Sequence, residues 1–202
     1  MTDLVLVRHG ETDWNRAGRV QGLTDIPLNE TGRDQARRAG HRLADDHFDA
    51  VVSSPLSRAA ETARIIAAEI SAPDVELLEA LVERNYGEAE GLTGPEIDAR
   101  FGGVVKARET REEVLGRVKP ALLALAERHT GQRVLVVSHG GVIGSLVRDA
   151  TQWVWPEHGT RIENGSDHVF HVEDGHIGLV EFAGRRWSTD LLPAEEPVRT
   201  AD

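Results

Sequence analysis

The sequence has no cysteine among its 202 residues. Disulfides, thiolate nucleophiles and cysteine-based zinc sites are therefore excluded. Long apolar runs are also lacking, because no stretch approaches the roughly 20 residues that a membrane span needs. The first residues, MTDLVLV, place no basic segment before an apolar one, so we expect no signal peptide. These absences favour a cytoplasmic protein with no membrane partner.

An excess of basic charge is also lacking, because 34 Asp and Glu residues outnumber 23 Lys and Arg residues and the formal net charge is −11. Nucleic-acid binders usually carry a basic footprint, so we expect no nucleic-acid partner. A local cluster of arginines can still bind a small anion. The length and an ordinary 40% of hydrophobic residues favour one domain over residues 1–190, followed by a flexible tail at 191–202.

Apolar runs alternate with helical patterns along most of the chain. Ser54 and Pro55 form a typical helix start, and Pro120 should perturb a long helix. The alternation predicts an α/β protein, a three-layer α/β/α sandwich with a mostly parallel central sheet. Strands are expected at 4–7, 49–55, 75–83 and 133–139, helices at 31–46, 56–70, 92–101, 110–129 and 141–152, and a hairpin at 167–182.

Two of the predicted strands end in a His-Gly pair. LVLVRHGETDWN delivers Arg8 and His9, and RVLVVSHGGVIGSL delivers His139. The strand at 49–55 ends in SSP, just before Arg58. Ligands of such sheets bind beyond the carboxyl ends of the strands. We therefore expect these four side chains to meet.

Their chemistry suits a phosphoryl group. Two guanidiniums offer planar, bidentate donors, and a helix N-terminus adds positive potential. One neutral imidazole can attack phosphorus, and a second, protonated imidazole can stabilise charge on the oxygens. A general acid, either a carboxylic acid or a further histidine, is still needed for the leaving oxygen.

Four segments together resemble the motifs of the histidine phosphatase, or phosphoglycerate mutase-like, superfamily. They are LVRHGET with Asn15, SSPLSRAAETA, ALVERNYGEAEGLT and VVSHGGVIGSL, in the family's order between residues 4 and 146. The resemblance implies a phosphoglycerate mutase-like fold and no metal or other cofactor. It also implies that His9 is the nucleophile and Glu83 the proton donor. The substrate-binding residues that it implies are Arg8, Asn15, Gln21, Arg58, His139 and Gly140.

The predicted function is a metal-independent phosphomonoester hydrolase, monomer or homodimer, that acts on small phosphorylated metabolites through a phosphohistidine. A cofactor-dependent phosphoglycerate mutase is the alternative, because ERNYG at 83–87 resembles the mutases' ERHYG. The short segment after this motif opposes the mutase. The sequence ARET, which stands where many phosphatases of the family have G-E-S, leaves the substrate open. A phosphate-binding module without catalysis is a third possibility.

Three weaker patterns compete with these interpretations. HGGVIGS resembles a dinucleotide fingerprint, but His139 stands where the first glycine belongs. His168, His171 and His176 could suggest a metal site, although histidines on the solvent face of a hairpin are the preferred interpretation. Trp153 and Trp155 could belong to the core or to a dimer contact.

Overall fold

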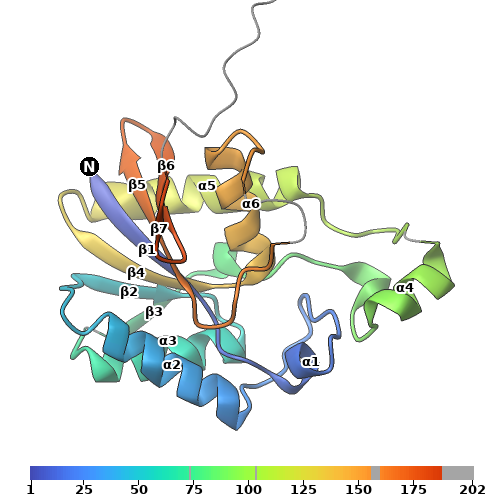
Figure 1. Cartoon of the computed structure of the whole chain (residues 1–202). Helices are drawn as coiled ribbons and strands as arrows, with labels where there is room; N and C mark the ends of the chain where they lie inside the picture. Colours follow the sequence, from blue (N-terminus) through green and yellow to red (C-terminus); the bar gives the residue numbers. More distant parts are fainter. Residues whose placement is uncertain (73, 103, 156–159, 188–202) are drawn as a thin grey trace, which may run out of the picture.

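A seven-stranded sheet forms the centre of the computed structural model, which describes residues 1–72, 74–102, 104–155 and 160–187 (Figure 1). The strand order is β3-β2-β4-β1-β5-β6-β7. The strands are β1 (Thr2–Arg8), β2 (Ala50–Ser53), β3 (Val75–Leu77), β4 (Arg133–Ser138), β5 (Asp167–Glu173), β6 (His176–Phe182) and β7 (Arg185–Arg186). Strands β1 to β4 run parallel, and β5 to β7 add an antiparallel edge beside β1. The predicted α/β class is confirmed, and the predicted tail at 191–202 lies outside the described residues.

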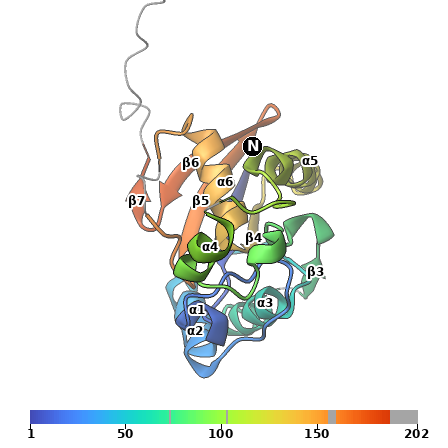
Figure 2. The same ribbon diagram turned by 90° about the vertical axis from the view of Figure 1, so that its right-hand side faces the viewer.

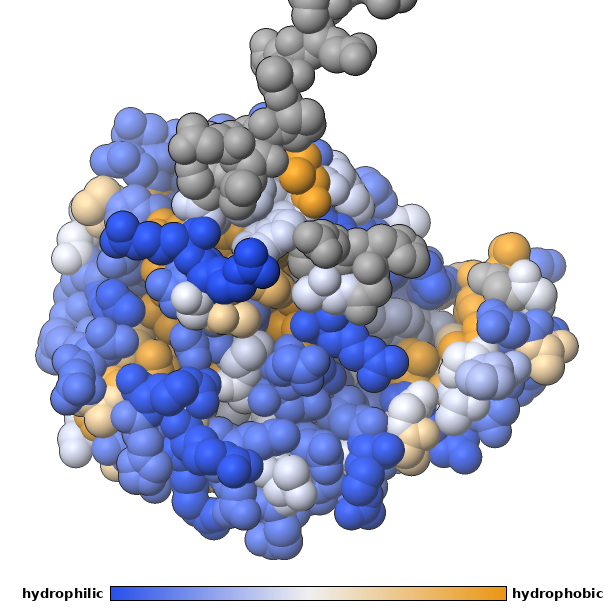
Figure 3. Space-filling view, viewed as in Figure 1, coloured by the Kyte–Doolittle hydropathy of each residue, from blue (hydrophilic) through white to orange (hydrophobic). Residues whose placement is uncertain are grey.

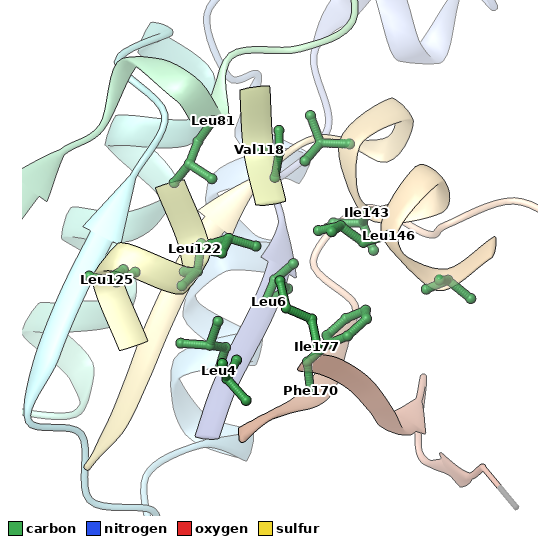
Figure 4. Packing of buried hydrophobic residues seen from close by; sticks show 14 of the residues in the cluster. Leu4, Leu6, Leu81, Val118, Leu122, Leu125, Ile143, Leu146, Phe170 and Ile177 are labelled. Atoms are coloured by element: carbon green, nitrogen blue, oxygen red, sulfur yellow. The ribbon is translucent and has the colours of Figure 1, made fainter. Parts of the chain in front are cut away.

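Helices cover both faces of the sheet, as the sandwich prediction requires (Figure 1). Helices α2 (Glu30–Arg42) and α3 (Ser57–Glu69) cover one face, and α5 (Arg111–Arg128) and α6 (Gly140–Ala150) cover the other. Side chains of β1 alternate between the layers, because successive residues of a strand face opposite ways. Leu4 and Leu6 pack with α5 and α6 (Figure 4), whereas Val5 and Val7 pack with α2 and α3.

Local capping fixes where the helices begin. The Asn29 side chain accepts a hydrogen bond from the Gly32 N–H at 2.9 Å and so starts α2. Thr110 and Glu113 form a capping box at the start of α5. Helix α5 is not interrupted at Pro120, which lies inside it. Pro120 and Gly116 are exposed, so water can satisfy the Gly116 carbonyl that lacks its helical partner.

Two short helices stand apart from the sheet. Helix α1 (Asp13–Arg16) and helix α4 (Gly94–Phe101) lie on the side of the molecule that faces the viewer in Figure 2. An isolated bridge between Arg19 and Thr93 links the segments next to them. Helix α4 has no buried residue, and Val104, beyond its C-terminal end, is exposed. The face of the molecule seen in Figure 3 is largely hydrophilic. Two 3-10 turns, Glu79–Leu81 and Gly87–Ala89, connect β3 to this region.

The hairpin of β5 and β6 turns at Asp174 and Gly175, both with positive φ, as a two-residue hairpin loop requires. The hairpin itself was predicted, but the position of one histidine in it was predicted wrongly. His168 is fully buried beside the Phe182 ring, whereas His176 is exposed.

The two tryptophans near the end of α6 differ in their surroundings. Trp155 packs against Phe182 and Trp187 at the edge of the core, so it has a structural role, whereas Trp153 is exposed. No helix among the described residues is both long and apolar enough to cross a bilayer.

Candidate active site

Three adjacent strands, β2, β4 and β1, deliver the predicted residues to one edge of the sheet. His9 follows β1 and His139 follows β4, and the His9 N–H donates to the Ser138 carbonyl at 3.0 Å. The imidazole centroids of His9 and His139 lie 5.1 Å apart. The structure therefore brings the two His-Gly ends together, because neighbouring parallel strands end at the same edge.

The His9 imidazole is buried and held in one orientation. Its Nδ1 lies 2.7 Å from the Gly10 carbonyl oxygen, which can only accept, so Nδ1 carries the proton. The other ring nitrogen, Nε2, then keeps its lone pair. Burial, followed by the charges of Arg8 and Arg58, lowers the pKa of His9 well below its ordinary value. A neutral imidazole with a free Nε2 can act as a nucleophile.

Arg58 is fully buried and Arg8 is partly buried beside His9, and both have donors without a hydrogen-bond partner among the described residues. The Arg8 Nη1 donates to the Ile162 carbonyl. The Arg58 Nη1 and Nη2 donate to the carbonyls of Thr24 and Gly22 at 3.0 and 2.8 Å. Both Nε atoms are buried without a hydrogen-bond partner among the described residues. Because an unpartnered buried donor is costly, these atoms fit an anion bound in the pocket.

His139 is fully buried, and Ser54 is its hydrogen-bond partner. The His139 Nε2 lies 2.8 Å from the Ser54 Oγ, while its Nδ1 has no partner among the described residues. Burial and then Arg58 lower the pKa of His139 well below its ordinary value. This direction favours a neutral His139 in the free protein, whereas the sequence pattern predicts a protonated second imidazole. If the Ser54 hydroxyl donates to Nε2, the neutral ring keeps its proton on Nδ1 and remains a donor.

The prediction that Ser54 caps the following helix is also wrong. Helix α3 starts at Ser57 with no side-chain cap. The Ser54 Oγ instead accepts from the Leu56 N–H at 3.3 Å and contacts His139.

We call Arg8, His9, Arg58 and His139 the phosphate pocket.

Glu83 is almost fully buried next to the start of α6. Its Oε1 accepts from the Arg84 N–H at 2.7 Å, and its Oε2 accepts from the Gly141 N–H at 3.1 Å. A Cβ added at Gly141 would lie 2.4 Å from the Glu83 Oε1, so this position needs glycine. Arg117 also donates to the Val82 and Glu83 carbonyls at 2.9 and 3.2 Å. The carboxyl group is thus held in one place from two sides.

The three remaining predicted site residues, Asn15, Gln21 and Gly140, line a cavity of about 400 Å³. Other predicted residues that line the same cavity are Arg8, His9, Arg58 and Glu83. Gly140 is the first residue of α6. Asn15 accepts from the Thr12 N–H at 3.2 Å and is thereby held at the start of α1. Gln21 is buried, and its Oε1 has no partner among the described residues. All eight predicted site residues therefore lie together.

Comparison with known proteins identifies the family. The model of the histidine phosphatase superfamily (branch 1) matches residues 4–184. The chain belongs to this superfamily. It is 37% identical to the uncharacterized phosphatase PhoE of Bacillus subtilis. The alignment spans 188 residues and covers 93% of this chain and 92% of that protein. It is 34% identical to a metal-independent phosphoserine phosphatase of Arabidopsis thaliana, over 96% of this chain and 90% of that protein.

The fold comparison agrees. The structure of Bacillus stearothermophilus YhfR matches this histidine phosphatase with a TM-score of 0.81 at 30% identity, over 92% of this chain and 98% of that chain. The predicted family, fold and phosphoester hydrolysis are confirmed by these matches.

Several residues around the cavity were not predicted. Tyr86 lines it, and burial followed by Glu83 raises the pKa of this tyrosine to about 12. Arg161, Glu163 and Asn164 reach it from the segment before β5. Asn164 and Gly165 form a recognisable turn signal, but no pattern in the sequence placed β5 next to β1. The histidine phosphatase site is thus completed by a segment distant in sequence from its motifs.

The hydrogen-bond donors of the phosphate pocket are guanidinium and imidazole nitrogens, which can bind an anion. Within residues 1–72, 74–102, 104–155 and 160–187, no three His, Asp or Glu side chains gather where they could hold a metal ion.

Proposed function

We propose that this histidine phosphatase hydrolyses small phosphomonoesters without a metal, through a phosphohistidine on His9. One observation carries the proposal: the His9 Nδ1 is fixed by the Gly10 carbonyl, while the unpartnered Nε atoms of Arg8 and Arg58 belong to the same pocket. This arrangement supplies a nucleophile together with donors for the phosphoryl oxygens, and phosphoryl transfer needs little else.

In the first step, the His9 Nε2 lone pair forms a bond to phosphorus while the bond from phosphorus to the ester oxygen breaks. The Glu83 carboxyl group gives its proton to the departing alkoxide. Arg8, Arg58 and the Nδ1–H of His139 donate to the phosphoryl oxygens and stabilise their charge. The products of this step are the free alcohol and phosphohistidine.

In the second step, the Glu83 carboxylate takes a proton from a water molecule that attacks phosphorus. The bond between phosphorus and Nε2 breaks, and inorganic phosphate leaves. Glu83 is again protonated and His9 is again neutral, so the cycle closes. Because Glu83 borders the same cavity as His9, one carboxyl group can serve both steps.

Small metabolites are the substrate class that the cavity favours, since about 400 Å³ is near the lower end of small-molecule sites. The Arabidopsis relative, named as a phosphoserine phosphatase, is consistent with this class. Mutase activity is the second candidate, because ERNYG at 83–87 resembles the mutase motif. A cytoplasmic location and a monomeric or homodimeric state stay predictions from the sequence.

A substrate panel tests the proposal. The purified protein is incubated with p-nitrophenyl phosphate, sugar phosphates and 3-phosphoglycerate, with and without EDTA, and one arm receives 2,3-bisphosphoglycerate. We expect release of inorganic phosphate that EDTA does not prevent. Interconversion of 3- and 2-phosphoglycerate without phosphate release would establish the mutase instead. No turnover in any arm would leave a phosphate-binding module.

A further inference from the structure

Asn164 lies just before β5, and its side chain connects two parts of the site. Its Nδ2 donates to the His9 carbonyl at 2.9 Å and to the Asn15 Oδ1 at 3.3 Å. A carbonyl oxygen can only accept, so the NH2 end of the Asn164 amide must be the end that faces His9. The two hydrogens of one NH2 group therefore join the backbone of the nucleophile to a side chain of helix α1.

The peptide between His9 and Gly10 is held at both of its polar groups. Its carbonyl accepts from Asn164, and its N–H donates to the Thr62 Oγ1 at 3.0 Å. The next carbonyl, that of Gly10, lies 2.7 Å from the His9 Nδ1 and orients the imidazole. Asn164 therefore helps to fix the backbone that sets the direction of the nucleophilic Nε2.

The amide of Asn15 is oriented by the same contact. Its Oδ1 also accepts from the Thr12 N–H at 3.2 Å, and a backbone N–H can only donate. The Oδ1 must therefore face Thr12 and Asn164, and the Nδ2 points away from both. This Nδ2 has no hydrogen-bond partner within the part of the chain that the structure describes, and Asn15 lines the cavity. The Asn15 NH2 group is thus available to a phosphoryl oxygen.

The backbone around Asn164 is tied to the strand that carries the nucleophile. The Gly165 N–H donates to the Arg8 carbonyl at 2.9 Å, and the Arg8 N–H donates to the Ser166 carbonyl at 3.0 Å. The Ile162 carbonyl accepts from the Arg8 Nη1. These bonds hold Asn164 at a fixed place, so its side chain can hold other groups in turn.

We propose that Asn164 is a positioning residue for phosphoryl transfer. Its NH2 group holds the His9 backbone and turns the Asn15 amide, so that the Asn15 Nδ2 donates to a phosphoryl oxygen. A misplacement of reacting groups by a small distance lowers the rate of transfer strongly. The inference rests on the proposed function, because the group that Asn164 positions is the nucleophile of that reaction.

A double-mutant cycle tests the coupling, with kcat/KM on p-nitrophenyl phosphate as the readout. Asn164→Ala should lower kcat/KM roughly 10- to 100-fold, because the His9 carbonyl and the Asn15 Oδ1 both lose a donor. Asn15→Ala should cost about 10-fold. The loss in the double variant should be at least about 5-fold smaller than the product of the two single losses, because each change breaks the same contact.

The affinity for inorganic phosphate, measured by calorimetry, separates positioning from a loss of stability. Asn164→Ala should weaken phosphate binding about 3- to 10-fold, as Asn15→Ala does, and the double variant should bind little worse than either. Asn164→Leu keeps a side chain of similar size without a donor, so it should show the same losses. This variant also serves the cycle if the smaller alanine destabilises the fold.

Ser166→Ala is the matched control, because it changes the same stretch of chain. The Ser166 Oγ donates to the Glu163 carbonyl at 2.7 Å and lies 2.9 Å from the His168 Nε2, so no contact with His9 or Asn15 is lost. This variant should have a lower Tm but the phosphate affinity of the wild type. Its effect on kcat/KM should multiply with that of Asn15→Ala within about 2-fold.

Three outcomes would overturn the inference: single losses that multiply fully in the double variant, wild-type phosphate affinity in Asn164→Ala, or wild-type activity in Asn164→Leu. If the wild-type protein hydrolyses p-nitrophenyl phosphate in those cases, the proposed function stands and only the positioning fails. If no phosphomonoester is hydrolysed but phosphate binding shows the coupling, the proposed function fails and the orientation of Asn15 by Asn164 stands.

Discussion

The phosphate pocket and the segment 161–164, which precedes β5, border the same cavity but are built differently. The residues of the phosphate pocket come from strand ends and the start of α3; His9, Arg58 and His139 are almost fully buried, and Arg8 is partly buried. The segment 161–164 has no helix or strand and carries the exposed charges of Arg161 and Glu163. Burial lowers the pKa of both histidines of the phosphate pocket, and the hydrogen bond to the Gly10 carbonyl fixes the orientation of His9. The exposed charges can be changed without altering the packing of the core.

The largest losses of kcat should come from replacing the two histidines of the phosphate pocket, and the two losses should differ in size. His9→Ala removes the nucleophile and should lower kcat at least about 10⁵-fold. His139→Ala removes one donor to the phosphoryl oxygens and should cost about 10²- to 10³-fold. Steady-state kinetics on p-nitrophenyl phosphate measure both. Equal losses of kcat in the two variants would contradict the assignment of His9 as the nucleophile and His139 as a hydrogen-bond donor.

Glu83 should show an effect that depends on the leaving group. Glu83→Gln should lower kcat on alkyl phosphates by about 10²- to 10⁴-fold, and by less on p-nitrophenyl phosphate, whose leaving oxygen needs no proton. Gly141→Ala should reproduce this pattern, because its Cβ would displace the carboxyl group. Glu79→Gln, an exposed change on the same segment, is the control. A loss independent of the leaving group would remove Glu83 from the role of acid.

Ser54 should have a smaller effect that acts through His139. Ser54→Ala removes the hydroxyl partner of Nε2 and should lower kcat/KM about 10-fold, the cost of one lost hydrogen bond in a buried site. Ser53→Ala removes a neighbouring buried hydroxyl that bonds only to the Ser54 carbonyl, so it should cost less. Ser54→Thr should restore most of the activity. Nitrogen NMR of His139 should show its proton on Nδ1 in the wild type, and a proton on Nε2 instead would contradict this account.

The smallest effect on activity, but a measurable one on stability, concerns His168 outside the site. Burial lowers the pKa of His168 from 6.5 to about 4, so between these values the unfolded chain binds more protons than the folded one. Stability should therefore fall as the pH is lowered from about 6.5 to about 4, by about 3 kcal/mol from this group. Urea unfolding across this range measures it. His168→Gln should flatten the pH dependence, whereas the exposed-site variant His176→Gln should not.

The sequence predicted the phosphate pocket because each of its residues follows a recognisable apolar strand or starts a helix. Parallel neighbours then bring Arg8, His9 and His139 to one edge. Other features depend on tertiary contacts that the pattern of apolar residues in the sequence does not predict. The Ser54 hydroxyl meets His139 instead of capping a helix, and His168 faces Phe182 because the two residues are register partners in the β5–β6 hairpin. Arg161 and Glu163 reach the cavity because they lie in the segment just before β5, which pairs with β1.

The most direct test of the central claim is to locate the phosphoryl group on the enzyme. The Glu83→Gln variant, in which water attack should be slow, is mixed with p-nitrophenyl phosphate, quenched at alkaline pH and mapped by peptide mass spectrometry. The account predicts an acid-labile phosphate on the Nε2 of His9. Phosphate on His139, or a burst of nitrophenol with no phosphorylated peptide, would contradict it.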